Sequence, residues 1–277
     1  MTITDRTVQN SILYKEDGTP ALVGSRGEIF VADLVEAVSR GLTTGTSGLT
    51  KGYASVNSTA IVPIRATTYT EPSSAAQREL VSSSTQDDAT PGGTGTRSVR
   101  ITYYDGSLNG PFTEDINLNG TSAVATVATD IRFVEKIESL TVGSNGTNVG
   151  TITLRNTGGG ATVGTIAVGD GCTNWAHHYV ASGRTCFVER INFGMIDNGL
   201  LGSVSGGSFL RAILPLTTNA FEKQITMTFR QNGTSTSQTH NMAKSLWVTG
   251  PARIVQYVRS DNATAGTAHG GFTFYDV

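Results

Sequence analysis

Apolar side chains recur at every second position in the middle of the chain. Val99, Ile101 and Tyr103 form one such run, and Phe112, Ile116 and Leu118 form the next. A period of two indicates β-strands that bury one face. The intervening residues 105–111 (Asp-Gly-Ser-Leu-Asn-Gly-Pro) are mostly residue types that favour a turn. We therefore expect the two runs to pair as a hairpin with a long loop.

After residue 155 the strand pattern repeats about every ten residues, a spacing typical of β-sandwiches and barrels. The strand count and patterning predict a mainly β fold: a jelly-roll-like antiparallel β-sandwich with an N-terminal arm and one short helix. Residues 182–184 (Ser-Gly-Arg) are predicted to turn a hairpin between two strands. The predicted strands are 162–168, 175–180, 185–193, 208–214, 224–230, 245–248, 254–259 and 271–275.

One segment has a helical period. Phe30, Val31, Leu34, Val35 and Val38 fall on one stripe, which predicts a helix over residues 28–40 that Gly41 ends. This helix either packs against the sandwich or docks on a neighbouring molecule. A weaker helical spacing over residues 124–131 is undermined by its β-branched residues.

Residues 1–27 have short apolar anchors and the character of an extended arm. Residues 41–60 are rich in Gly, Thr and Ser, as in a loop or linker. We predict that residues 1–95 comprise the arm, the helix over 28–40 and this linker, and that residues 96–277 form the β-sandwich domain.

The composition narrows the classes of function. Charged residues make up 15% of the chain, against roughly 25% in typical domains. The formal net charge is −2 without a basic stripe, so we expect no nucleic-acid partner. No apolar run approaches the ~18 residues that a membrane span requires, so we expect no membrane partner. The first residues lack the apolar core of a signal peptide, and we expect a soluble protein made in a cytoplasm.

Few residues are candidates for chemistry. Asp170, Cys172 and His177 could converge as metal ligands. His177 and His178 are adjacent, so in a strand they point to opposite faces and do not share an ion. The simpler interpretation is an aromatic-rich strand end formed by Trp175, His177, His178 and Tyr179. We expect no catalytic, metal-binding or cofactor-binding residue, and no cofactor.

Acidic and sulfur-containing side chains give no stronger signal. Glu114 and Asp115 point in opposite directions and make a poor acid–base pair. Glu135, Lys136 and Glu138 are most simply a solvated face. Cys172 and Cys186 are expected to be reduced thiols, although neighbouring strands would allow them to pair.

The stretches 97–105 (RSVRITYYD), 112–124 (FTEDINLNGTSAV) and 175–186 (WAHHYVASGRTC) resemble virion structural proteins of tailed bacteriophages. The resemblance covers residues 75–200 best. It implies a capsid decoration (cement) protein that clamps neighbouring shell subunits. The alternative is a tail, baseplate or fibre component, one version of which binds a host glycan. It implies no catalytic residue.

An enzyme such as a glycan hydrolase is the third hypothesis, and it fits least because it needs two carboxylates held across a cleft. We therefore expect a non-enzymatic protein of the virion, made in the host cytoplasm. The expected partners are further copies of the chain in a homotrimer, together with the major capsid protein or other virion proteins.

Overall fold

The structure is a computed structural model that describes residues 12–14, 20–22, 45–56, 59–90, 92–197, 203–213, 221–232, 235–260 and 266–277. Every regular element in these ranges is a β-strand, and every pairing between them is antiparallel, which confirms the mainly β antiparallel fold. In the arm, β1 (Ile12–Tyr14) pairs with β2 (Pro20–Leu22). The predicted helix over 28–40 lies outside the described residues.

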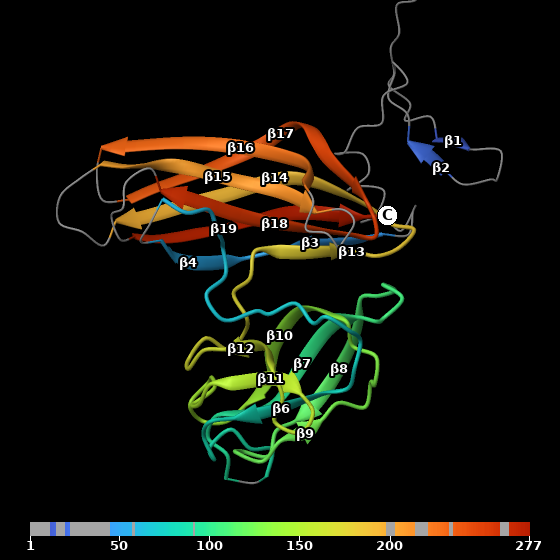
Figure 1. Ribbon diagram of the computed structural model, residues 1–277, viewed down its shortest axis with the longest axis vertical. Coiled ribbons are helices and arrows are strands. Elements are labelled where there is room, and N and C mark those ends of the chain that lie inside the picture. The colour runs from blue at the N-terminus through green and yellow to red at the C-terminus, as the bar shows by residue number, and fades with distance from the viewer. Residues whose placement is uncertain are drawn as a thin grey trace, which may run out of the picture.

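Two sheets form the larger of two lobes, which lies uppermost in Figure 1. One sheet has the order β17-β14-β19-β3, with β4 also paired to β19. The other has the order β13-β18-β15-β16, with β5 also paired to β18. Their bounds are β3 (Thr46–Leu49), β4 (Gly52–Val56), β5 (Val62–Pro63), β13 (His177–Val180), β14 (Thr185–Asp197), β15 (Ser203–Ile213), β16 (Phe221–Asn232), β17 (Ser235–Thr249), β18 (Ala252–Ser260) and β19 (Gly266–Asp276).

The path of the chain between these sheets is that of a jelly roll. From β14 to β19, the chain passes to the opposite sheet at every step except the β15–β16 hairpin. In each sheet, two short strands lie end to end where one long strand would otherwise be. β3 and β4 lie along successive parts of β19, while β5 and β13 lie along successive parts of β18. The chain therefore leaves the sandwich after β5 and returns at β13.

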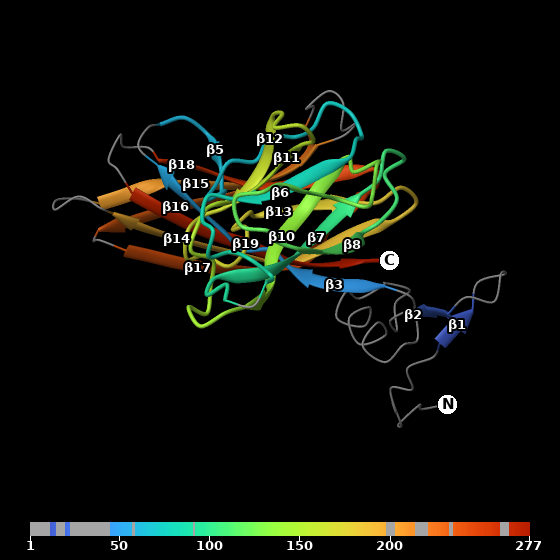
Figure 2. The same cartoon turned by 90° about the horizontal axis from the view of Figure 1, so that it is seen from below.

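The residues between β5 and β13 form the second lobe, which we call the inserted domain. Seen from below, it lies across the middle of the sandwich (Figure 2). Its sheets have the orders β10-β7-β8 and β12-β11-β6-β9. Their bounds are β6 (Arg78–Ser82), β7 (Thr96–Tyr104), β8 (Phe112–Asn117), β9 (Val124–Ala125), β10 (Phe133–Val142), β11 (Ile152–Asn156) and β12 (Thr162–Ile166).

The predicted hairpin is present in the inserted domain. β7 pairs with β8, with Val99 opposite Ile116 and Tyr103 opposite Phe112. Val99 and Ile101 are completely buried in the core that the two small sheets share. Each such aliphatic side chain stabilises the fold by about 1.5–3 kcal/mol. The weak helical spacing over 124–131 was misleading, because this stretch forms β9 and a loop in which Val127 is 86% exposed.

A completely buried carboxylate organises the loops of the inserted domain. Asp87 accepts hydrogen bonds from the hydroxyl of Ser82 (2.6 Å) and from the backbone amides of Thr96 (2.8 Å), Val149 (2.9 Å) and Gly150 (2.8 Å). Neighbouring Asp88 is partly exposed and accepts a backbone bond from Thr90. Asp87, which lies between β6 and β7, thus ties the ends of these two strands to residues 149–150, because charge-assisted bonds of this kind are among the stronger ones.

A second carboxylate holds the β11–β12 turn. Glu79 on β6 accepts bonds from the amides of Gly158 (3.0 Å) and Gly159 (2.9 Å) and from the Arg155 guanidinium (2.7 Å). The Gly159 amide and the Arg155 side chain lower the pKa of Glu79. The charged form of Glu79 is therefore the one that the fold stabilises.

The predicted linker was wrong in part. Residues 46–49 and 52–56 form β3 and β4 beside β19. Their glycines permit close packing: a Cβ on Gly48 would lie 2.4 Å from the Phe274 ring, and one on Gly52 would lie 2.6 Å from the Ile64 carbonyl oxygen. The sheets also extend across the predicted boundary at residue 96, since β3, β4 and β5 belong to the sandwich and β6 to the inserted domain.

The turn at residues 182–184 also differs from expectation. It connects β13 to β14, but these strands lie in opposite sheets and do not pair with each other. Gly183 has φ +75° there, a conformation that suits glycine. The turn therefore closes one end of the sandwich instead of forming a hairpin within one sheet.

Candidate functional site

The two domains meet along β13, and this short strand is buried on both faces. Alternate side chains point to opposite sides, as expected for a strand. Ala176 and Val180 join the hydrophobic clusters of the sandwich, whereas Trp175 and Tyr179 join those of the inserted domain. The stretch therefore serves two cores at once, and we call its contacts with the inserted domain the junction.

Aromatic rings fill the side of the junction that faces the inserted domain. The Tyr69 ring lies 4.8 Å from that of Trp175 and 4.9 Å from that of His177, measured between ring centroids. The Phe133 ring stacks on that of Tyr179 at 4.7 Å. The Tyr69 and Tyr179 hydroxyls share a 2.5 Å hydrogen bond. Because such rings combine large buried area with favourable pair geometry, they fasten the domains together.

Polar groups of β10 hydrogen-bond to the edge of β13 that does not pair with another described strand. The Glu135 carboxylate accepts hydrogen bonds from the Tyr179 amide (2.9 Å) and from Nδ1 of His178 (2.9 Å). Nε2 of His177 lies 3.2 Å from the Val134 carbonyl oxygen and 3.1 Å from that of Glu135, so it acts as the donor. Burial and the nearby Arg65 charge hold the pKa of His177 well below its usual value.

A β-bulge aims Glu135 at β13. The register between β10 and β7 passes from Val134 to Lys136, so Glu135 has no partner on β7. Bulges of this kind redirect a side chain. The prediction of a solvated face was therefore wrong for Glu135, whose side chain is 15% exposed, whereas Lys136 and Glu138 do form a partly exposed ion pair.

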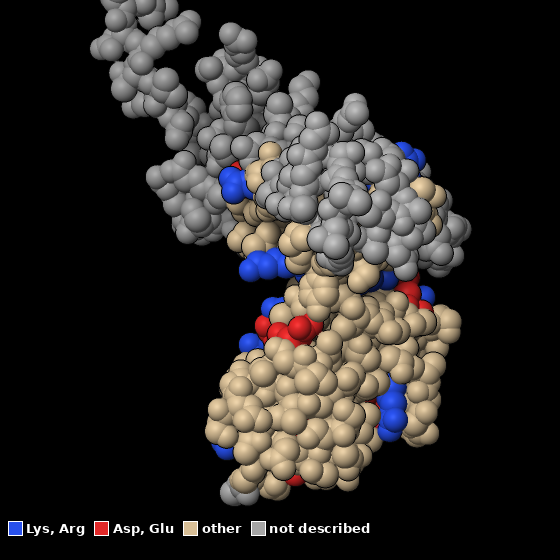
Figure 3. All heavy atoms as spheres, turned by 90° about the vertical axis from the view of Figure 1, so that its left-hand side faces the viewer, with Lys and Arg blue, Asp and Glu red and all other residues tan. Residues whose placement is uncertain are grey.

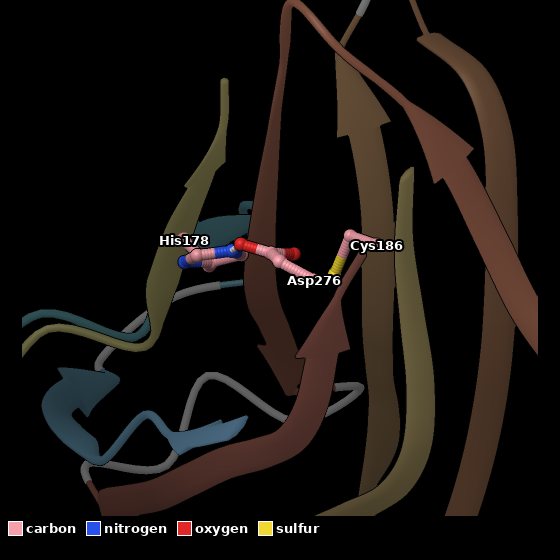
Figure 4. Close-up of side chains that lie close together, drawn as sticks. All are labelled: His178, Cys186 and Asp276. Atoms are coloured by element: carbon pink, nitrogen blue, oxygen red, sulfur yellow. Dashed lines mark hydrogen bonds and ion pairs between the residues drawn. The ribbon is translucent and has the colours of Figure 1, made fainter. Parts of the chain in front are cut away.

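On the sandwich side, His178 reaches a small buried cluster (Figure 4). Its Nε2 lies 2.8 Å from Oδ2 of Asp276, and Cys186 lies beside both. Burial alone would lower the pKa of His178, but the charge of Glu135 and the hydrogen bond to Asp276 outweigh it and raise that pKa well above its usual value. Burial raises the pKa of the Cys186 thiol to about 12.

The residues that the sequence offered as candidate metal ligands do not come together in the structure. Within the described ranges, Asp170, Cys172 and His177 do not form a ligand cluster; the three side chains that do are His178, Cys186 and Asp276. His177 and His178 occupy opposite faces, as predicted. Both cysteines are free thiols, with Cys172 half-buried and Cys186 buried.

The remaining predicted candidates have structural partners. Asp170 accepts bonds from the Tyr53 hydroxyl (3.0 Å) and the Asn174 amide (3.1 Å). Asp115 forms an exposed ion pair with Arg100, while Glu114 binds the backbone amides of a loop. Trp175, His177, His178 and Tyr179 are at most 3% exposed, so this strand does not offer a free edge to a ligand.

Sequence reasoning missed Glu135 and Asp276. Glu135 lies forty residues or more before the strand that it covers, and Asp276 comes from the last strand of the chain. The sequence around these two residues contains no pattern that would predict their burial.

The narrow waist between the two lobes carries acidic and basic side chains next to one another (Figure 3). The residues gathered here therefore form a domain junction that is held by aromatic contacts and hydrogen bonds.

Comparisons with known proteins give little beyond this description. No protein-family model matches the chain, and no curated protein matches it. Among solved structures, a chain of infectious bursal disease virus, Gx strain, aligns with 9% identity, 84% of this chain and 72% of that chain, at a TM-score of 0.22. A chain of the T13 particle of the same virus aligns with 10% identity, 84% and 73% coverage, at a TM-score of 0.21. Scores this low carry no argument about function.

Proposed function

We propose that this chain is a non-enzymatic structural protein of a bacteriophage virion, and specifically a capsid decoration protein that clamps neighbouring shell subunits. The observation that carries the proposal is the junction. His178, Glu135 and Asp276 are the side chains most similar to a catalytic site, but they are largely buried at or beside the junction and hydrogen-bond to one another or to the backbone. Such an arrangement supports a rigid two-lobed body whose task is association.

The surface supports association through apolar contacts. Trp247 on the edge strand β17 is 54% exposed, Val168 is 60% exposed and Val127 is 86% exposed. Tryptophan is enriched where proteins bind each other. A stable contact with the shell would bury about 1,000 Å² or more, and many copies on one particle would add avidity.

The proposed partners follow from the same role. They are the major capsid protein or other virion proteins and two further copies of the chain in a homotrimer; nucleic acid and membranes are not among them. Within the described ranges, there is no helix with the length and hydrophobicity required to cross a bilayer. The proposed location is the virion, after synthesis in the host cytoplasm.

Light scattering on the purified protein tests the homotrimer, since the proposal requires a particle mass three times that of one chain.

Decoration is tested by binding to undecorated heads. The full chain and a variant lacking residues 1–41 are incubated with heads from a phage that lacks the gene, and bound protein is quantified after sedimentation. The proposal predicts saturating binding by the full chain and loss of binding by the truncated one, whose described strands begin only at Thr46. Full decoration by the truncated chain would show that residues 1–41 are not needed for docking.

The second candidate function is a tail, baseplate or fibre component that recognises a host glycan. A cavity of about 440 Å³ on the sandwich favours it. Its lining includes the rings of Tyr53 and His269 together with Lys51, Asn174 and Asn192, and aromatic rings beside amide groups are suited to a sugar. A glycan-array screen in which a hit is abolished by Tyr53→Ala would favour this candidate over decoration.

A further inference from the structure

His178, Cys186 and Asp276 form a buried cluster inside the sandwich that the contacts between the two domains do not explain. The three side chains come from β13, β14 and β19, and thus from both sheets of the sandwich (Figure 4). Their exposed fractions are 3%, 0% and 5%, and one nitrogen, sulfur or oxygen atom from each lies within 4.8 Å of the others. Asp276 Oδ1 is buried without a hydrogen-bond partner. Such an atom is costly unless a donor or a cation approaches it.

We propose that His178, Cys186 and Asp276 bind a divalent transition-metal ion, with zinc as the ion that fits best. Imidazole nitrogen, thiolate sulfur and carboxylate oxygen are the donors that zinc takes in proteins. Hard cations such as Mg²⁺ and Ca²⁺ prefer oxygen throughout, so the cysteine disfavours them. The unpartnered Oδ1 of Asp276 offers a further donor atom on the same carboxylate.

Glu135 completes the arrangement from the inserted domain. Metal-binding histidines usually donate their second ring N–H to a carboxylate, which fixes the tautomer and the orientation of the ring. Nδ1 of His178 lies 2.9 Å from Oε1 of Glu135, which leaves Nε2 to face Asp276 and Cys186. The Phe274 ring stacks on the imidazole at 3.6 Å and limits its rotation. Glu135 is thus a positioning residue for the site.

Charge and proton balance are consistent with zinc. In the metal-free cluster one proton lies on Nε2, where it bonds Asp276 at 2.8 Å, and another lies on the Cys186 thiol. Zinc binding displaces both protons to solvent and leaves neutral imidazole, thiolate and carboxylate around the ion. The two ligand charges neutralise Zn²⁺. The ion would then link both sheets of the sandwich directly and the inserted domain through Glu135.

The test measures metal in the full-length protein. Wild type, Cys186→Ser and the control Cys172→Ser are stripped with a chelator, reconstituted with zinc, dialysed and analysed by mass spectrometry for metals. The proposal predicts about one zinc per chain in wild type and in Cys172→Ser, and at most about a tenth of that zinc content in Cys186→Ser, which loses the thiolate ligand. Circular dichroism reports whether each variant is folded.

Cobalt substitution keeps the test decisive if Cys186→Ser does not fold. Wild-type protein reconstituted with Co²⁺ should show a thiolate-to-cobalt charge-transfer band in the near ultraviolet, and Cys172→Ser should retain it. A wild-type protein that binds neither zinc nor cobalt overturns the proposal, and so does a cobalt complex without that band. Zinc retained in full by folded Cys186→Ser also overturns it.

Discussion

Replacing Glu135 with Gln is the sharpest test of how the two domains are held together. Both carboxylate oxygens accept hydrogen bonds, one from Nδ1 of His178 and one from the amide of Tyr179. A glutamine side chain has nearly the same shape but only one oxygen. Its NH₂ group must therefore face one of the two donors, and one buried N–H loses its acceptor.

The expected cost follows from these contacts. A buried donor left without an acceptor destabilises by about 1–3 kcal/mol, and a hydrogen bond that involves a charged group contributes about 1.5–3 kcal/mol. We expect Glu135→Gln to lower the free energy of unfolding by about 3 kcal/mol. With an unfolding entropy of roughly 2.1 cal/mol/K per residue, that corresponds to a fall in Tm of about 5 °C for a chain of this size.

Glu138→Gln is the matched control, because it makes the same change on the same strand. The Glu138 side chain is 34% exposed and pairs with Lys136 at the surface, so its loss should cost less than about 1 kcal/mol. Urea unfolding is followed by fluorescence in a Trp247→Phe background, where Trp175 in the junction is the sole tryptophan. Equal destabilisation by the two changes would refute the fastening role of Glu135.

Three further predictions concern the inserted domain. Asp87→Asn places an amide among backbone donors and should destabilise by about 3 kcal/mol in urea, against less than about 1 kcal/mol for Asp88→Asn; similar values would contradict the buried network. Gly164→Ala puts a methyl group 2.4 Å from the Trp175 ring and should cost about 1–3 kcal/mol with altered tryptophan fluorescence; an unchanged spectrum and stability would count against this packing. The pKa of Glu79 is lowered on folding, so its contribution to stability is present above the unfolded pKa of about 4.3 and is lost as pH falls through the folded value. Glu79→Gln should therefore flatten the acid limb of a stability–pH curve, and an identical curve would refute the assignment.

Local patterns were sufficient to locate β7 and to assign the two faces of β13. The alternation at Val99, Ile101 and Tyr103 located β7, and adjacency alone placed His177 and His178 on opposite sides of β13. These inferences depend only on the two-residue period of a strand.

Contacts between distant segments could not be read in the same way. β3 and β4 looked like linker because their glycines serve close packing against Phe274 and Ile64, which no local pattern records. The bulge that turns Glu135 toward β13 depends on the register with β7. Asp276 joins the buried cluster only because the last strand of the chain lies beside β14. Tertiary pairing, not local propensity, determined these features.

Decoration of the shell is tested most directly by cryo-electron imaging of purified particles, with an antibody against this chain to identify its density. A decoration protein should give a two-lobed density on the outside of the shell, between major capsid subunits. Density at the tail tip would replace decoration with the host-recognition candidate. Absence of the chain from purified particles would contradict a structural role in the virion.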